Sequence, residues 1–128
     1  MDDRKIRVLA VDHNPMLREG ISVLVRLQPD MELVGAAATS DQAVRLFAEH
    51  RPQVTLMDLD LPFHAGIKAI KDIRRIDPTA CIFGLLTYEW DECGHAALVA
   101  GASSILAKDK LTERLPEMLR RAGAQHYP

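Results

Sequence analysis

The sequence predicts an α/β fold, in which a parallel sheet of five strands is covered by helices on both faces. Five short apolar segments alternate with five segments of helical pattern over 128 residues, and parallel strands need such crossover helices between them. The third apolar segment, Val54–Met57, contains only apolar or β-branched residues and shows no alternation. That pattern is typical of a strand buried on both faces of a parallel sheet.

The predicted strands are short segments that end in polar or turn-forming residues. The first, Ile6–Val11, runs into Asp12-His13-Asn14-Pro15, and the third runs into Asp58. Polar residues at these positions mark the carboxyl ends of strands, where parallel sheets bind ligands. The full set of strands is expected at residues 6–11, 32–37, 54–58, 80–86 and 103–107.

Helices are expected between these strands because apolar residues recur there at helical spacing. The first helix begins at Pro15, which suits a first helical turn, and ends before Pro29. Thr39 and Gln42 have the spacing of a capping box, which predicts a second helix through about His50. The isoleucines of the third helix fall at Ile67, Ile70, Ile73 and Ile76.

The last two helices are defined by small residues and by a proline. Residues 91–100 are predicted to form a helix of small residues that ends at Gly101, a residue suited to a left-handed C-cap. The fifth helix is expected between Thr112 and Gly123. Pro116 confines its start, because proline is tolerated in the first turn of a helix but not further in.

Composition limits the class of protein. The chain is interpreted as one domain, with a core at about residues 5–122 and a tail or the start of a linker at 123–128. A net charge of −2 gives no indication of nucleic-acid or membrane binding. Cys81 and Cys93 have no CxxC spacing, which indicates a reduced compartment. No apolar run approaches the ~20 residues of a membrane span, so the cytoplasm is expected.

The predicted topology brings polar residues from four strands to one edge of the sheet. The flavodoxin-like order 2-1-3-4-5, a three-layer doubly wound sandwich, is common at this size and places Asp12 and Asp58 on adjacent central strands. Thr87 and Lys108 follow strands four and five. Carboxylates suit Mg²⁺, Lys and Thr suit phosphoryl oxygens, and a carboxylate can attack phosphorus directly. The set predicts phosphoryl transfer onto aspartate.

Short motifs surround these residues. They are Val11-Asp12, Pro15, Arg18-Glu19-Gly20, Met57-Asp58-Leu59-Asp60-Leu61-Pro62 with Gly66, Leu86-Thr87, Gly101-Ala102-Ser103 and Lys108-Asp109. Together they resemble the receiver domain of bacterial two-component response regulators, over residues 5 to about 122. Arg18-Glu19-Gly20 and Lys108-Asp109 are most similar to the subfamily with a LuxR-type helix-turn-helix output domain.

The resemblance implies a role for each residue of the site. Asp58 would accept a phosphoryl group from a sensor histidine kinase or from a small donor such as acetyl phosphate. Asp12, Asp58 and the backbone carbonyl of Asp60 would hold Mg²⁺. Lys108 would pair with the phosphoryl group, and Thr87 would move to bond it.

The resemblance also implies a switched interaction surface. Helix four, strand five and helix five would form an output or dimerisation face, with helices one and five as a second dimer face. DNA would be bound only through an output domain that lies outside this sequence. The chain is interpreted as the N-terminal part of a longer transcription regulator, with a stand-alone receiver as the alternative. Asp60 and Glu89 occupy positions that tune the phosphoryl lifetime in the family, and Trp90 could lie in a partner face.

Two residues depart from the family pattern. His13 stands where a second acid is usual, and imidazole is a poor ligand for Mg²⁺. Three hypotheses stay open: His13 points to solvent and Mg²⁺ binds more weakly, protonated His13 supplies charge in place of the metal, or the domain is a phosphorylation-independent interaction module. Ile105 replaces an aromatic residue that reports the state of the switch, which predicts an altered relay.

An enzymatic alternative rests on Asp58-Leu59-Asp60, an Asp-x-Asp motif like that of haloacid-dehalogenase-type phosphatases. That family places the motif after its first strand and needs a longer chain for its cap. The receiver interpretation is therefore preferred. It implies a phosphoacceptor that assists its own phosphorylation and dephosphorylation and is otherwise not an enzyme.

Overall fold

A computed structural model describes residues 4–88 and 92–126 of the chain. Helices and strands alternate along it as the sequence predicts. The strands are β1 Ile6–Val11, β2 Met31–Ala37, β3 Val54–Asp58, β4 Cys81–Leu86 and β5 Ser104–Ala107. The helices are α1 Pro15–Arg26, α2 Ser40–His50, α3 Ala65–Ile76, α4 Glu92–Ala100 and α5 Leu111–His126, with the short 3₁₀ helices η1 Pro62–His64 and η2 Lys108–Lys110.

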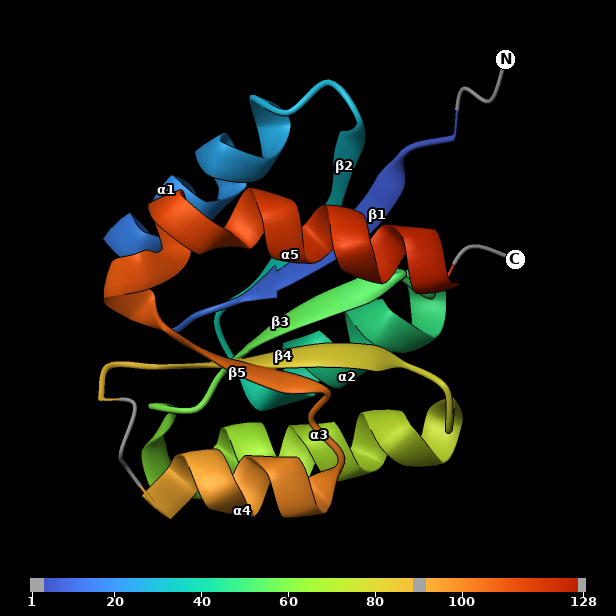
Figure 1. The fold of residues 1–128 in the computed structure, drawn as a ribbon. Coiled ribbons are helices and arrows are strands. Elements are labelled where there is room, and N and C mark those ends of the chain that lie inside the picture. Colours follow the sequence, from blue (N-terminus) through green and yellow to red (C-terminus); the bar gives the residue numbers. More distant parts are fainter. Residues whose placement is uncertain (1–3, 89–91, 127–128) are drawn as a thin grey trace.

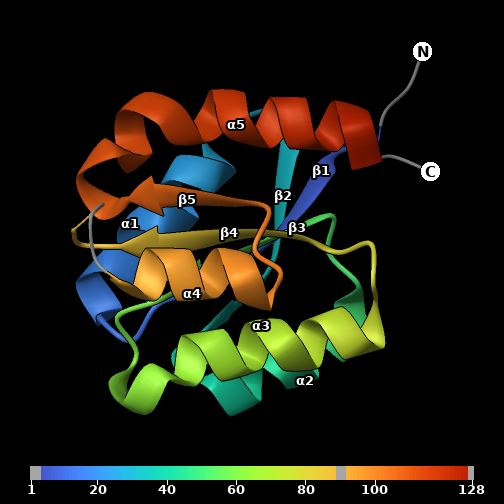
Figure 2. The same ribbon diagram turned by 60° about the horizontal axis from the view of Figure 1, so that its bottom comes forward.

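The strands form one parallel sheet in the order β2-β1-β3-β4-β5, so the predicted doubly wound topology is confirmed. Helices α1 and α5 cover one face of the sheet, and α2, α3 and α4 cover the other (Figure 1). The three layers are also visible in Figure 2, where α5 lies on one side of the strands and α3 and α4 on the other.

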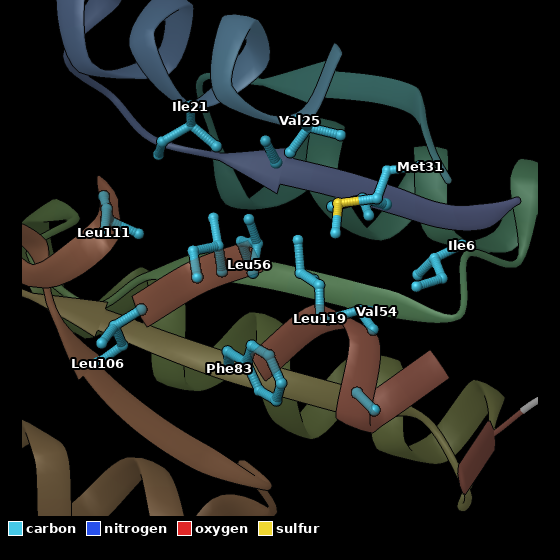
Figure 3. Packing of buried hydrophobic residues seen from close by; sticks show 14 of the residues in the cluster. Ile6, Ile21, Val25, Met31, Val54, Leu56, Phe83, Leu106, Leu111 and Leu119 are labelled. Atoms are coloured by element: carbon cyan, nitrogen blue, oxygen red, sulfur yellow. The ribbon is translucent and has the colours of Figure 1, made fainter. Parts of the chain in front are cut away.

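Each face of the sheet has its own hydrophobic core. Under α1 and α5, side chains such as Ile21, Val25 and Leu119 pack on Leu56 and Phe83 of the sheet (Figure 3). Under α2, α3 and α4, the second cluster is built from Phe47, Ile70 and Ile73 against Leu9 and Ile82 and their neighbours. Burial on both sides explains why β1, β3 and β4 consist of almost unbroken apolar runs.

The predicted helix caps are confirmed at α2 and α4. Thr39 Oγ1 accepts a hydrogen bond from the backbone N–H of Gln42 at 3.2 Å. The Gln42 side chain accepts from the N–H of Ala38, one residue before the cap, at 3.0 Å. Gly101 has a φ of +123°, and its N–H and that of Ala102 return to the carbonyl of Ala97, which closes α4 as a glycine C-cap does.

Helix α5 is where the sequence interpretation of element bounds was wrong. The helix begins at Leu111, directly after η2, and Pro116 therefore lies inside it rather than in its first turn. A proline at this position cannot donate to the carbonyl of Thr112. Thr112 is exposed, so water can satisfy that carbonyl. The helix also continues past Gly123 to His126.

Two further features bear on the sequence-based expectations. In the described part of the chain, no helix combines the length and apolar character that a membrane span requires. Cys81 is buried in β4 and Cys93 is partly exposed in α4, and the two do not form a disulfide with each other. Burial raises the pKa of the Cys81 thiol, although Ser103 and Arg74 oppose this.

Candidate functional site

The carboxyl ends of β1, β3 and β5 deliver three charged side chains to one place. Val11 pairs with Met57 across the sheet, so Asp12 and Asp58 lie side by side at the sheet's edge. Both aspartates are fully buried, at 0% exposure. Lys108 follows β5 directly and reaches both of them. The predicted juxtaposition of these residues is present in the structure.

Lys108 is the cation at the centre of this cluster. Its Nζ lies 2.8 Å from Asp58 Oδ1, 3.0 Å from Asp12 Oδ2 and 3.0 Å from Asp60 Oδ2. Burial favours the neutral amine and would lower the pKa of Lys108, but the contacts with the three carboxylates outweigh it and raise that pKa. Lys108 is therefore a fixed positive charge at neutral pH.

Asp58 accepts hydrogen bonds at both of its carboxylate oxygens. Oδ1 accepts from Lys108 Nζ at 2.8 Å and from the backbone N–H of Asp60 at 2.8 Å. Oδ2 accepts from the backbone N–H of His13 at 3.1 Å and from its ring at 2.6 Å. Burial acts to raise the pKa of Asp58, but these four hydrogen bonds outweigh burial and lower the pKa. The carboxyl group is ionised at neutral pH.

His13 turns its ring toward Asp58, and the hypothesis that it points away into solvent is wrong for this structure. Its Nδ1 is 2.6 Å from Asp58 Oδ2 and 3.9 Å from Asp12 Oδ1. An ionised carboxylate only accepts, so Nδ1 must carry a proton in this contact. The side chain is still 47% exposed, which leaves it a path to rotate outward.

Asp60 has a side-chain role that the sequence did not reveal. Its Oδ2 accepts from the Thr87 hydroxyl at 2.8 Å, from the Thr87 N–H at 3.1 Å and from Lys108 Nζ at 3.0 Å. Thr87 therefore reaches the cluster through Asp60 instead of contacting Asp58. The Asp-x-Asp spacing was the available signal, because residues two apart near a strand end can lie on the same side.

The loop after β3 fixes the position of Asp58. Phe63 and His64 have φ values of +59° and +55°, so this loop turns sharply. Gly66 is buried at the start of α3, and a Cβ at this position would collide with the backbone carbonyl oxygen of Asp58. The glycine of the Asp-x-x-x-Pro-x-x-x-Gly pattern is thus required by the close approach of α3 to the strand end.

The donor set fits a divalent cation only in part. Ligand atoms of Asp12, His13 and Asp58 all lie within 4.8 Å of one another. Asp12 Oδ2 is buried and accepts no well-oriented hydrogen bond within the described residues, although the Lys108 ammonium is near. The two carboxylates suit Mg²⁺, which prefers oxygen, whereas the imidazole does not and its proton is directed at Asp58.

Ile105 lies next to the core under α2, α3 and α4. Its side chain is half-buried and packs over Gly84. An altered relay stays a prediction. Glu89 and Trp90 lie outside the described residues.

A family model for the response regulator receiver domain matches residues 8–120. The chain belongs to the response regulator receiver family. It is the receiver domain of a two-component response regulator. The Asp-x-Asp motif accordingly follows the third strand of a receiver, not the first strand of a phosphatase.

Curated relatives include transcriptional regulatory proteins and a protein-glutamate methylesterase. The chain is 36% identical over 123 residues to the uncharacterized transcriptional regulatory protein YxjL of Bacillus subtilis, covering 96% of this chain and 56% of that protein. It is 35% identical to LiaR of the same organism, over 92% of this chain and 56% of the relative. A protein-glutamate methylesterase of Shewanella frigidimarina is 36% identical over 80% of this chain and 26% of its own length.

Solved structures agree with the fold and with the LuxR-type resemblance. The response regulator domain of Thermotoga maritima CheB superimposes with a TM-score of 0.83 at 31% identity, over 93% of this chain and 96% of that one. A LuxR-family response regulator from Aurantimonas sp. gives a TM-score of 0.80 at 30% identity, over 91% and 86%. The receiver described here spans roughly half or less of the curated relatives it matches.

Replacing Lys108 with methionine is expected to raise the pKa of Asp58. Lys108 supplies one of the hydrogen bonds that hold this pKa low. A lowered carboxyl pKa stabilises the fold above the unfolded value of ~3.9, and this contribution is lost as pH falls through the folded pKa. The variant should therefore unfold at higher pH during acid titration. Carbonyl-detected NMR titration checks the pKa, and an unchanged Asp58 titration would contradict the assigned contact.

Proposed function

We propose that Asp58 of this receiver accepts a phosphoryl group. The observation that carries the proposal is the state of its carboxylate, which is fully buried, ionised and hydrogen-bonded by a fixed Lys108 ammonium. A buried carboxylate with such partners at the carboxyl edge of a parallel sheet is suited to nucleophilic attack on phosphorus.

In the reaction, an oxygen of Asp58 forms a bond to phosphorus while the donor's bond to the same phosphorus breaks. That bond is P–N in a phosphohistidine of a histidine kinase and P–O in acetyl phosphate, and its electron pair leaves with the donor. Both oxygens of Asp58 are already hydrogen-bonded, so one partner must first withdraw. The His13 ring is 47% exposed and Lys108 only 12%, so the ring withdraws more readily.

An open pocket gives the donor access to this edge. Its volume is about 690 Å³, and Thr87 and Lys108 form part of its wall together with Leu17 and Tyr88. A donor in this pocket would meet the Lys108 ammonium, which attracts phosphoryl oxygens. This arrangement supports approach of the phosphoryl group from the side of β4 and β5.

Mg²⁺ is proposed as the cofactor, held by the carboxylates of Asp12 and Asp58 and by the backbone carbonyl of Asp60. When bound, the ion would neutralise charge on the phosphoryl oxygens. His13 replaces a third oxygen ligand and must give up its contact with Asp58 Oδ2. Binding is therefore expected to be weaker than in a site with two acids after β1.

The whole protein is proposed to be a cytoplasmic transcription regulator that acts through an output domain beyond this receiver. The support is the similarity to YxjL and LiaR, which are named as transcriptional regulatory proteins. A sensor histidine kinase is the proposed donor. Phosphorylation would alter the face of α4, β5 and α5 or that of α1 and α5 and so drive dimerisation. Exposed Leu98 and Val99 on α4 suit such contacts.

A second function, a phosphorylation-independent interaction module, is favoured by one observation. The His13 ring occupies Asp58 Oδ2 at 2.6 Å, and a ring fixed there would block both the metal and the phosphoryl group. The module would then present its surfaces in a single state.

Intact-mass analysis after incubation with acetyl phosphate separates the two functions. The expected result is one phosphoryl adduct that requires Mg²⁺ and disappears in Asp58→Ala. An adduct that forms equally well without Mg²⁺ would favour charge substitution by His13. No adduct from acetyl phosphate or from any phosphorylated histidine kinase of the source organism would favour the interaction module.

A further inference from the structure

The carboxylate of Asp60 binds the two side chains that a phosphoryl group on Asp58 would need. One oxygen, Oδ2, accepts from the Thr87 hydroxyl at 2.8 Å and lies 3.0 Å from Lys108 Nζ. The same oxygen accepts from the Thr87 N–H at 3.1 Å. An anionic oxygen thus gathers the hydroxyl and the ammonium at the pocket in the unphosphorylated receiver.

Lys108 has no donor to spare in this arrangement. An ammonium group has three N–H donors, and three carboxylates lie within 3.0 Å of Nζ. Asp12 and Asp58 are fully buried, whereas the Asp60 side chain is 29% exposed. If the ammonium is to contact a new anion, Asp60 is the partner that loses least on release, because water can solvate it.

We propose that Asp60 is a positioning residue whose carboxylate takes the place of the phosphoryl oxygens before phosphorylation, and that it competes with the phosphoryl group for Thr87 and Lys108. This inference rests on the proposed phosphoacceptor role of Asp58. It changes the expected movement of Thr87: the hydroxyl is already at the pocket and exchanges one oxyanion for another. Asp60 thus holds Thr87 and Lys108 close to the phosphorylation site. A phosphoryl group on Asp58 must displace the Asp60 carboxylate before it can bind them.

Binding of beryllofluoride, an analogue of the phosphoryl group, measures the competition directly. In Asp60→Asn the amide oxygen can still accept from Thr87, but the charge that holds Lys108 is gone. With saturating Mg²⁺, the variant is expected to bind beryllofluoride roughly tenfold or more tightly than the wild type, the scale of one charge-assisted hydrogen bond. Equal affinity of the variant and the wild type would overturn the proposal.

A matched control removes a charge close to Lys108 in the chain without touching the contact. Asp109 is exposed and makes no hydrogen bond or ion pair with Thr87 or Lys108 in the described structure. Asp109→Asn should leave beryllofluoride affinity within about twofold of the wild type, as expected for an exposed charge. An equal gain in Asp60→Asn and Asp109→Asn would assign the effect to net charge and refute a specific competition.

A double-mutant cycle tests whether Thr87 is shared. Thr87→Val removes the hydroxyl that donates to Asp60, so competition remains only for Lys108. Asp60→Ala removes both the charge and the acceptor of the hydroxyl, and its gain in beryllofluoride affinity is expected to be smaller in the Thr87→Val background than in the wild type. An identical gain in both backgrounds would show that the hydroxyl does not pass from Asp60 to the analogue.

The contact itself is tested without any phosphoryl ligand. In the free wild-type receiver the Thr87 N–H donates to Asp60 Oδ2, so Asp60→Ala should shift the Thr87 amide proton resonance upfield. No shift would overturn the proposal at its first step. An upfield shift would confirm the contact between Thr87 and Asp60. If neither the wild type nor Asp60→Asn then bound beryllofluoride, both the competition and the phosphoacceptor role of Asp58 would be refuted.

Discussion

Replacing His13 with aspartate is expected to tighten Mg²⁺ binding by roughly tenfold or more, the scale by which ligand charge and the surrounding groups tune metal sites. The substitution supplies an oxygen ligand and a second acid after β1. It also removes the ring that hydrogen-bonds to Asp58 Oδ2 at 2.6 Å and occupies one oxygen of the acceptor. Isothermal titration calorimetry of the two proteins with MgCl₂ at constant ionic strength measures the difference in Mg²⁺ affinity.

His95→Asp is the matched control for this prediction. His95 is exposed on α4 and is not among the clustered ligand atoms of Asp12, His13 and Asp58 in the described structure. The variant adds the same charge to the protein. Its Mg²⁺ affinity should equal that of the wild type. If His13→Asp also bound Mg²⁺ with wild-type affinity, the ring would have no influence on the site and the argument from ligand chemistry would fail.

Replacing Gly66 with alanine is expected to destabilise the fold by about 1–3 kcal/mol, the usual cost of forcing extra atoms into a packed site. The new Cβ would collide with the Asp58 carbonyl oxygen, and its other neighbours are backbone atoms of Asp58 and Leu59 that cannot rotate away. The displaced strand end would also move the acceptor. Urea denaturation measures the stability, and acetyl phosphate labelling measures the effect on Asp58.

Gly20→Ala provides a control with the opposite sign. Gly20 is exposed in α1, and a Cβ there would meet nothing within 4 Å. Alanine is a better helix former than glycine by about 1 kcal/mol, so this variant should be slightly more stable than the wild type. Wild-type stability of Gly66→Ala would mean that the loop after β3 has more room than the structure gives it.

Much of the site could be predicted from sequence because strand ends carry it. With the common order 2-1-3-4-5, the ends of β1 and β3 are adjacent and the end of β5 lies at the same edge of the sheet. Asp12 and Asp58 could therefore be placed side by side from topology, and Lys108 could be placed at the same edge. The resemblance to receiver domains then assigned a chemical role to each of these residues.

Other features depend on side-chain geometry that no local pattern encodes. The direction of the His13 ring follows from the hydrogen bond available at Asp58, and Asp60 faces Thr87 and Lys108 because their donors lie there. The early start of α5 follows from η2 leading directly into it, and Thr112, four residues before Pro116, is exposed. For His13 and Asp60, contacts with residues that are distant in the sequence decide the conformation.

Chemical localisation of the phosphoryl group tests most directly whether Asp58 is the acceptor. Borohydride reduces an aspartyl phosphate to homoserine, and peptide mass spectrometry then identifies the modified position. After acetyl phosphate and Mg²⁺, homoserine is expected at position 58 alone, because this carboxylate is buried, ionised and beside Lys108. Homoserine at Asp12 or Asp60, or a phosphoryl group retained on His13, would contradict the assignment of Asp58.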